Sequence, residues 1–409
     1  MTSAAPQQRF PLPALLVISG AIFASVSTEF LPTGLIPDIA SELHVSVSQV
    51  GLLVTVFAIT VVISTAPLTS LTLRFPRKSL MVAMLGVLVI ANVLCAVAPS
   101  YAFLAVARVL GGLAHGVFWS VTGPYAARLV ERRQLSRAVA VTQGGGSAAF
   151  VLGVPLGTAL GHALGWRMSF AVMAGVVLLL LVLVVVALPP VSHLVTLSTG
   201  EIAVPARRDR TLPALVIVAV TILFINLGQN TFSTYVVPWS IGVGSVPAAD
   251  VGALLAASGA AGAVGLVIAG VFGDRYPRGA MVALATLMVV ASCALALFAP
   301  GSPLRVVIGL IIVGLAYGGI PSLLHSRMQH SVSARIRDTA AAWVTISFNL
   351  AIGCGALLGA VLLDRLGIQV LPWAGAALVL VAVVFILATD RRRIALHPGE
   401  SHGHIRGHR

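Results

Sequence analysis

The chain contains twelve apolar runs, each about as long as a helix that crosses a lipid bilayer. A transmembrane helix needs about 20 mostly apolar residues, and a chain inside the bilayer must satisfy all of its backbone polar groups internally. The sequence therefore predicts an all-α polytopic membrane protein. The twelve expected spans are 13–35, 49–72, 79–99, 102–127, 138–163, 167–188, 213–239, 250–272, 279–300, 304–325, 339–362 and 369–389.

Composition excludes a soluble protein of this length. Of 409 residues, 58% are hydrophobic and only 9% are charged, and a soluble surface needs more charge than that. The three cysteines, Cys95, Cys293 and Cys354, all lie in apolar runs, which favours packing roles over a disulfide framework. The N-terminus shows no removable signal peptide, so we expect the first span to remain.

The basic residues predict the orientation of the spans. If the N-terminus is cytoplasmic, all but four of the 25 basic residues fall in cytoplasmic segments; the exceptions are Arg108, Arg167, Arg305 and Arg365. This is the positive-inside pattern, with both termini in the cytoplasm. The formal charge of +13 thus reflects topology and contact with an anionic leaflet, and it does not indicate a nucleic-acid partner.

The chain is expected to consist of two halves of six spans. The longest connection carries Pro189, Pro190 and Pro205 and the cluster Arg207, Arg208 and Arg210. We therefore predict a cytoplasmic N-terminus at 1–12, a first half at 13–188, a linker at 189–212, a second half at 213–389 and a cytoplasmic tail at 390–409.

The second half repeats short sequences of the first at offsets of 201 or 202. Because each half has an even number of spans, the halves should share one orientation and be related by an axis along the membrane normal. The matching pairs are 50–53 with 251–254, 74–77 with 275–278, 112–116 with 314–318, and Gly153 and Gly157 with Gly355 and Gly359.

Glu29 is the one carboxylate that lies well inside an apolar run. A charge at the centre of the bilayer costs about 2.5–3.5 kcal/mol on insertion scales, and such residues usually face a protein interior and take part in transport. The alternative is a structural Glu bonded to neighbouring spans. In the fourth span, Arg108 could influence the protonation of Glu29, or its side chain could reach the membrane surface. His115 could relay protons or pack as a neutral side chain.

Two halves, a linker and a parallel repeat resemble the major facilitator superfamily. That family has a loop motif, approximately G-x-x-x-D-R-x-x-R, after the second span of a half, and the second half keeps it from Gly270 to Arg278. In the first half Leu73 stands at the position of the acid. The first half therefore lacks the carboxylate that would pair with the basic residues of this loop and hold the cytoplasmic gate closed. The resemblance implies a cytoplasmic gate, for which the candidate residues are Asp274, Arg275, Arg278, Arg74 and Arg77.

The fifth and first spans carry the resemblance further. Gly153, Pro155 and Gly157 are similar to the glycine–proline signature of proton antiporters, which favours efflux over uptake. The run from Thr28 to Ile39 resembles the sugar-efflux and arabinose-efflux-permease branch of the drug:proton antiporters, which also includes chloramphenicol exporters. This likeness implies that Glu29 is the coupling acid. The Arg108 to Gly116 segment also looks typical of that branch, and we include Arg108 and His115 with Glu29 as candidate proton-coupling residues.

Candidate substrate contacts come from the seventh and eleventh spans. Amides can bind hydroxyl or carbonyl groups of a polar ligand, and aromatic rings can cover its apolar faces. Each of these side chains could equally hold helices together. The candidates are Asn226, Gln229, Asn230, Trp343, Phe348 and Asn349.

We therefore predict a proton-coupled exporter of a sugar or an amphipathic drug in the bacterial inner membrane, working as a monomer by alternating access. The alternatives are an uncoupled facilitator of the same fold and, more specifically, a chloramphenicol-type resistance exporter. An intramembrane enzyme is disfavoured because the spans show no zinc-ligand pair, paired acids or Ser/His/Asp grouping. We expect no cofactor and no metal, since the histidines of the tail are irregularly spaced.

Overall fold

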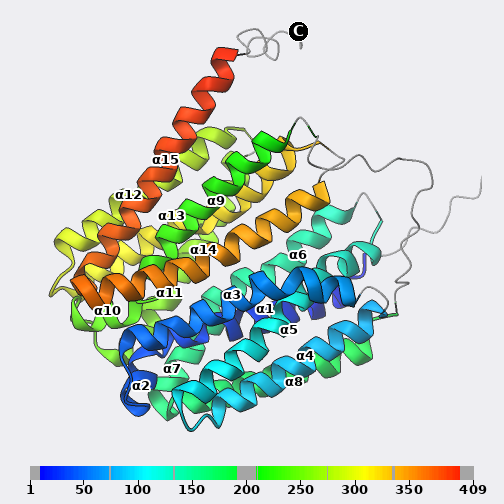
Figure 1. The fold of residues 1–409 in the computed structure, drawn as a ribbon, viewed down its shortest axis with the longest axis horizontal. Coiled ribbons are helices and arrows are strands. Elements are labelled where there is room, and N and C mark those ends of the chain that lie inside the picture. The colour runs from blue at the N-terminus through cyan, green and yellow to red at the C-terminus, as the bar shows by residue number, and fades with distance from the viewer. Residues whose placement is uncertain are drawn as a thin grey trace, which may run out of the picture. The chain divides into compact units, whose positions relative to one another are not determined.

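The structure is a computed structural model that describes residues 10–72, 75–131, 134–190, 209, 211–273, 275–333 and 337–396. Within these ranges all regular secondary structure is helical (Figure 1). Twelve of the described helical segments are long and apolar enough to cross a membrane. The predicted all-α polytopic membrane fold is confirmed, and the observed spans match the expected ones to within a few residues, apart from the seventh.

Fifteen α-helices are described, together with three short helical turns. The helices are α1 (Leu12–Gly34), α2 (Ile36–Glu42), α3 (Val47–Leu71), α4 (Arg77–Ala96), α5 (Tyr101–Arg128), α6 (Leu135–Ala148), α7 (Val154–Leu164), α8 (Trp166–Ala187), α9 (Leu212–Ser233), α10 (Val236–Gly242), α11 (Val251–Gly273), α12 (Pro277–Phe298), α13 (Pro303–Ser331), α14 (Arg337–Leu366) and α15 (Leu371–Leu396). The turns are η2 (Ala149–Gly153), η4 (Ala248–Asp250) and η6 (Ile368–Val370).

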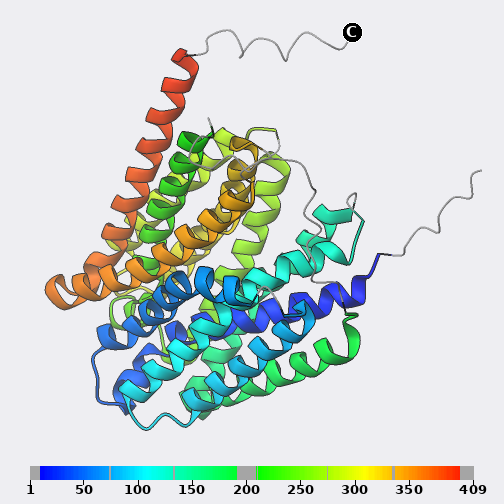
Figure 2. The ribbon, with the colours of Figure 1, turned by 45° about the vertical axis from the view of Figure 1, so that its right-hand side comes forward.

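Contacts between residues divide the chain into two compact units. The first is formed by the described residues of Met1–Glu201 with Tyr235–Gly242 and Val246–Gly259, and the second by those of Ile202–Thr234, Val243–Ser245 and Ala260–Arg409. In the first unit α1 packs against α6 and α8, and α4 lies between α5 and α8 (Figure 2). In the second unit α9 packs against α14 and α15, and α12 against α13.

The seventh span is shorter than predicted. We expected one helix over 213–239, but α9 ends at Ser233 and the separate helix α10 follows. The physical reason is Pro238. In a continuous helix its nitrogen could not donate to the carbonyl of Thr234, and its ring would clash with that carbonyl. A proline in the first turn of α10 avoids both penalties.

The backbone repeats at the same offsets as the sequence. The long helices α1 and α9 are each followed by a seven-residue helix, α2 and α10. Next comes a non-glycine residue with positive φ, His44 at 53° and Ser245 at 57°. Such angles are uncommon for residues other than glycine. Their recurrence 201 residues apart shows that both repeats make the same turn before their next helix.

The fifth span contains one turn of π-helix, η2, directly before Pro155. Proline removes one backbone donor and pushes against the preceding turn, so the chain widens there and the N–H of Val154 bonds to the carbonyl of Ala149. The chain thus forms a π-bulge just before Pro155. Such bulges occur often at functional sites.

Glycines of the fifth span allow it to approach α1 closely. A Cβ built on Gly153 would lie 1.9 Å from Ser27 Oγ, one on Gly157 would lie 2.4 Å from Leu31 Cδ1, and one on Gly161 would lie 2.2 Å from Leu35 Cδ2. Three glycines spaced four residues apart therefore meet three successive turns of α1. Small residues at this spacing typically mark close helix contacts in membranes.

Adjacent glycines in α6 provide a matched test of this packing. A Cβ on Gly145 would lie 1.9 Å from the backbone oxygen of Ser19, whereas a Cβ on Gly144 meets nothing within 4 Å. We expect Gly145→Ala to lower stability by about 1–3 kcal/mol through overpacking. Gly144→Ala should be neutral or stabilising by up to about 1 kcal/mol, because alanine favours helix. Melting of the two variants in detergent checks this, and equal melting points would contradict it.

Candidate functional site

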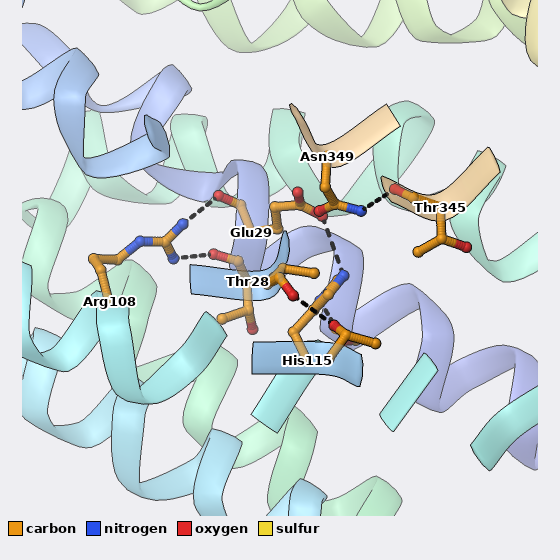
Figure 3. A network of polar contacts seen from close by, with 9 residues as sticks. Thr28, Glu29, Arg108, His115, Thr345 and Asn349 are labelled. Carbon is orange, nitrogen blue, oxygen red and sulfur yellow. Dashed lines mark hydrogen bonds and ion pairs between the residues drawn. The ribbon is translucent and has the colours of Figure 1, made fainter. Parts of the chain in front are cut away.

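Glu29 lies in the C-terminal third of α1 and its side chain is buried in the first unit (Figure 3). Its Oε2 atom is 3.5 Å from Nε2 of His115 on α5. Its Oε1 atom is also shielded from solvent and has no hydrogen-bond partner among the described residues. One carboxyl oxygen therefore faces an imidazole, while the other is left available for a proton or a ligand.

His115 connects Glu29 to a hydroxyl one turn earlier on α1. Its Nδ1 atom is 2.9 Å from Ser25 Oγ, and both residues are buried. The hydroxyl can donate or accept, so either neutral tautomer of the imidazole can be satisfied there. With Nε2 protonated, the ring faces Glu29 as a donor; with Nδ1 protonated, it can accept a proton from the carboxyl. Ser25, His115 and Glu29 thus form a continuous polar chain.

Arg108 is bonded to the backbone of α1 and not to a carboxylate. Its Nη1 donates to the carbonyl of Thr28 and its Nη2 to that of Glu29, each at 2.6 Å. The sequence explains why these acceptors are available. Pro32 stands four residues after Thr28 and has no N–H, so the Thr28 carbonyl lacks its helical partner. The guanidinium of Arg108 replaces that missing donor.

The possibility that Arg108 reaches the membrane surface is wrong, because the side chain is only 1% exposed. Its guanidinium carbon lies 4.2 Å from the centre of the Phe57 ring, a geometry in which a cation is attracted to an aromatic face. The same ring makes an edge contact with His115, at 5.3 Å between centroids. Phe57 therefore separates the two polar groups and fixes the position of both.

This arrangement keeps a fixed positive charge near Glu29 without neutralising it through a direct ion pair. A buried charge requires partners, and the guanidinium finds them in two carbonyl groups and an aromatic face. The Glu29 carboxyl remains free to gain or lose a proton while α1 keeps its backbone bonds. Reversible protonation beside an imidazole is what the geometry can perform chemically.

The second unit contains an uncharged counterpart of this site. Tyr317, which matches His115 at an offset of 202, donates to Oδ1 of Asn226 at 2.7 Å. Asn226 matches Ser25 at an offset of 201, so the same pair of positions is bonded in both repeats. Asn230 occupies the position of Glu29, and Leu310 that of Arg108. Of the two repeats, only the first has a carboxyl, a guanidinium and an imidazole at these positions.

The other amides predicted to contact substrate make local bonds in the second unit. Asn226 also donates to the carbonyl of Ile222 at 2.8 Å, and Asn230 donates to the carbonyl of Asn226 at 2.8 Å. Gln229 is half-buried. Asn349 donates to the carbonyl of Thr345 at 3.0 Å, whereas its Oδ1 has no partner among the described residues.

The two predicted aromatic contacts differ in their surroundings. Trp343 is 44% exposed on α14. Phe348 packs against the hydrophobic core of the second unit and stacks on His325, with 5.4 Å between ring centroids.

The residues predicted to form the gate are only partly described. Asp274 and Arg74 lie outside the described residues. Arg77 is buried at the start of α4, while Arg275 and Arg278 are exposed. The guanidinium of Arg275 lies against the ring of the neighbouring Tyr276, 5.7 Å from its centre. A charge latch at this loop stays a prediction.

Several residues of the site were missed in the sequence. Ser25 could have been found, because the repeat offset pairs it with Asn226 just as it pairs His115 with Tyr317. Asn92, whose amide donates to Thr28 Oγ1 at 3.1 Å, was the only amide in its apolar run. Phe57 carried no signal, since a phenylalanine in a membrane span is ordinary. Among the described residues, no three His, Cys, Asp or Glu side chains gather as a metal site; the histidines of the tail lie outside that part of the chain.

Twelve spans, an internal repeat and a buried acid–imidazole pair define a multi-pass membrane protein of the transporter class. The sequence profile of the Major Facilitator Superfamily matches residues 18–244 and 219–405. The chain belongs to that family of transporters, as predicted, and it is therefore a transporter and not an enzyme.

Known proteins similar to the chain agree with this assignment. It is 30% identical over 382 residues to a "Probable sugar efflux transporter" of Helicobacter pylori, covering 93% of this chain and 95% of the relative. A protein with the same description from Mannheimia succiniciproducens is 29% identical over 378 residues, covering 91% and 92%. The predicted resemblance to the sugar-efflux branch is thus confirmed.

Solved structures show the same fold at low sequence identity. A bacterial homologue of the human lysosomal transporter Spinster, inward-facing and unoccupied, superposes with a TM-score of 0.74 at 15% identity, covering 95% of this chain and 98% of that one. The nucleoside transporter NupG gives a TM-score of 0.75 at 13% identity, covering 92% and 99%. These similarities concern the fold alone.

Proposed function

We propose that the protein exports a sugar from the bacterial cytoplasm in exchange for protons, working as a monomer by alternating access. The observation that carries the proposal is the buried Glu29 carboxyl, with one oxygen at His115 and the other unpartnered. The substrate class is taken from the two relatives described as probable sugar efflux transporters. Cytoplasmic termini follow from the distribution of arginines along the sequence.

The proposed cycle depends on competition at Glu29. Sugar from the cytoplasm binds while the carboxyl is ionised, because a carboxylate accepts strong hydrogen bonds from hydroxyl groups. The protein then opens to the other side, and a proton from there neutralises the carboxyl and weakens the bond to the sugar. Sugar leaves, and the protonated protein returns. Ser25 can satisfy either tautomer of His115, so the imidazole can accompany the proton without losing its own partner.

The energy available suffices for such an exchange. One unit of pH gradient supplies about 1.4 kcal/mol per proton, and the membrane potential adds about 2.3 kcal/mol per charge per 100 mV. For exchange of one proton for one sugar, each pH unit can support about a tenfold sugar gradient. We assign Asp274, Arg275, Arg278, Arg74 and Arg77 to the cytoplasmic gate of this cycle, and the amides Asn230 and Asn349 to substrate contacts, as further parts of the proposal.

Transport by purified protein in liposomes tests the function. With a pH gradient across the vesicle membrane, labelled L-arabinose or D-galactose should accumulate on the acidic side and leak back when an ionophore removes the gradient. Equilibration without accumulation would overturn coupling and favour an uncoupled facilitator. Accumulation of chloramphenicol with neither sugar transported would overturn the sugar assignment and favour a drug exporter.

A further inference from the structure

Trp119 carries a buried hydrogen-bond donor that the proposed cycle does not use. It follows His115 by one helical turn on α5, and the centres of their rings are 6.0 Å apart. Its indole Nε1 is shielded from solvent and has no hydrogen-bond partner among the described residues. Leaving such a donor unpaired is unfavourable, because it loses its hydrogen bond to water and gains none in return. A donor of this kind next to a functional site is explained if a ligand pairs with it.

Glu29 offers an unpaired acceptor that complements the unpaired donor of Trp119. Glu29 Oε1 is likewise shielded and unpartnered, while Oε2 of the same carboxyl faces His115. His115 thus contacts Trp119 and Glu29, and each of them carries an unsatisfied group, a donor on α5 and an acceptor on α1. A hydroxyl group accepts one hydrogen bond and donates another. It is the simplest ligand group that satisfies a donor and an ionised acceptor together.

Comparison of the repeats shows that these features occur together. At an offset of 202, Trp119 corresponds to Pro321, which has no donor at all, and at 201 Glu29 corresponds to Asn230. The second unit therefore lacks both the indole and the acid at these positions. The indole and the carboxylate are both present in one repeat and both missing from the other, as expected if they bind one ligand.

We propose that Trp119 is a specificity-determining residue whose indole N–H binds a hydroxyl group of the sugar, with Glu29 accepting from the sugar in the ionised state. This inference rests on the proposed function and names the group on the substrate that the site recognises. It requires that a sugar lacking the recognised hydroxyl binds more weakly, and that the indole N–H is the reason.

Trp119→Phe tests the inference because it keeps an aromatic ring and removes the N–H. A matched control exists at Trp166, the first residue of α8, whose indole Nε1 is also buried and unpartnered among the described residues. Trp166 packs on Phe170 and Arg167. Both variants make the same change in volume and remove the same kind of donor, but only Trp119 contacts His115.

The measurement is binding of L-arabinose and D-galactose to purified full-length protein, by calorimetry, for wild type and both variants. We expect Trp119→Phe to weaken binding of the better sugar about tenfold and Trp166→Phe to leave it unchanged. Single-deoxy derivatives of that sugar complete the experiment. The derivative lacking the recognised hydroxyl should bind wild type about tenfold more weakly and lose no further affinity in Trp119→Phe, because the interaction is already absent.

The outcomes separate this inference from the proposed function. Three results would overturn the role of Trp119, whether or not transport is proton-coupled. Trp119→Phe could bind sugar as tightly as wild type, or both tryptophan variants could lose the same affinity. In the third result, the loss from Trp119→Phe adds to the loss from every deoxy derivative. Failure of wild type to bind either sugar would overturn it as well. Sugar binding that depends on Trp119 without proton release in wild type would leave the inference standing and overturn antiport.

Discussion

Glu29→Gln is expected to abolish sugar accumulation driven by a pH gradient while leaving exchange of labelled for unlabelled sugar measurable. Glutamine has nearly the same shape as a protonated glutamate but cannot release a proton. Its amide oxygen still accepts a hydrogen bond, so sugar binding should be weakened and not lost. Sugar can then cross in both directions, and the gradient no longer drives it. In liposomes the variant should equilibrate sugar without concentrating it, and sugar-induced proton release from the purified protein should disappear.

Glu42→Gln is the matched control for this experiment. Glu42 ends α2 and pairs with Arg167, and its side chain is exposed. The change removes one carboxylate from the first unit but leaves the buried site intact, so accumulation should persist. Continued accumulation by Glu29→Gln would show that the coupling proton binds elsewhere. Loss of exchange as well as accumulation would show that sugar binding requires the ionised carboxylate itself, and the prediction that Glu29→Gln still exchanges sugar would then be wrong.

Arg108→Leu should strongly destabilise the protein, and the loss should depend on Pro32. Removing the guanidinium leaves the carbonyls of Thr28 and Glu29 without these donors in a buried environment. Each unpaired buried group costs about 1–3 kcal/mol. We therefore expect a melting point several degrees below wild type in detergent. Arg108→Lys should rescue it only in part, because an ammonium group cannot copy the fork of a guanidinium.

Pro32→Ala tests whether the loss of stability in Arg108→Leu depends on Pro32. Alanine restores the N–H that the Thr28 carbonyl lacks, so the pair Pro32→Ala with Arg108→Leu should be less destabilised than the sum of the single variants. The natural second repeat supports this reasoning, because Ser233 stands where Pro32 would be and Leu310 where Arg108 would be. Strict additivity of the two losses would contradict the link between the proline and the arginine.

Most of the fold could be predicted from the sequence because the bilayer imposes a simple rule on length and polarity. Runs such as 49–72 and 167–188 became helices with nearly the expected bounds, since in lipid the backbone must satisfy itself. The exception was the seventh span, where hydrophobicity continued past Ser233 but Pro238 prevented the helix from doing so. Local stereochemistry decided that boundary, and a hydrophobic pattern alone does not register it.

The candidate site was predicted in its ionisable members and missed in the rest. Glu29, Arg108 and His115 stood out because charge and imidazole are costly in apolar runs, and the structure brings all three together in the first unit. Ser25, Phe57 and Trp119 are ordinary residues for a membrane helix. Their importance comes from which atoms they contact, and composition does not encode that.

The sequence by itself determined the class of fold, the number of spans and the identity of the buried acid, because each follows from the cost of placing polar groups in lipid. It also determined the repeat, because the two halves keep matching sequences at a nearly constant offset. Only the tertiary structure decided what the buried charges contact. Arg108 binds the Thr28 carbonyl, which Pro32 leaves without a helical donor, and the Glu29 carbonyl, but it does not pair with the Glu29 carboxyl. This depends on the register between α1 and α5. That register is set by packing between helices distant in the chain, where small differences in contact decide which donor meets which acceptor.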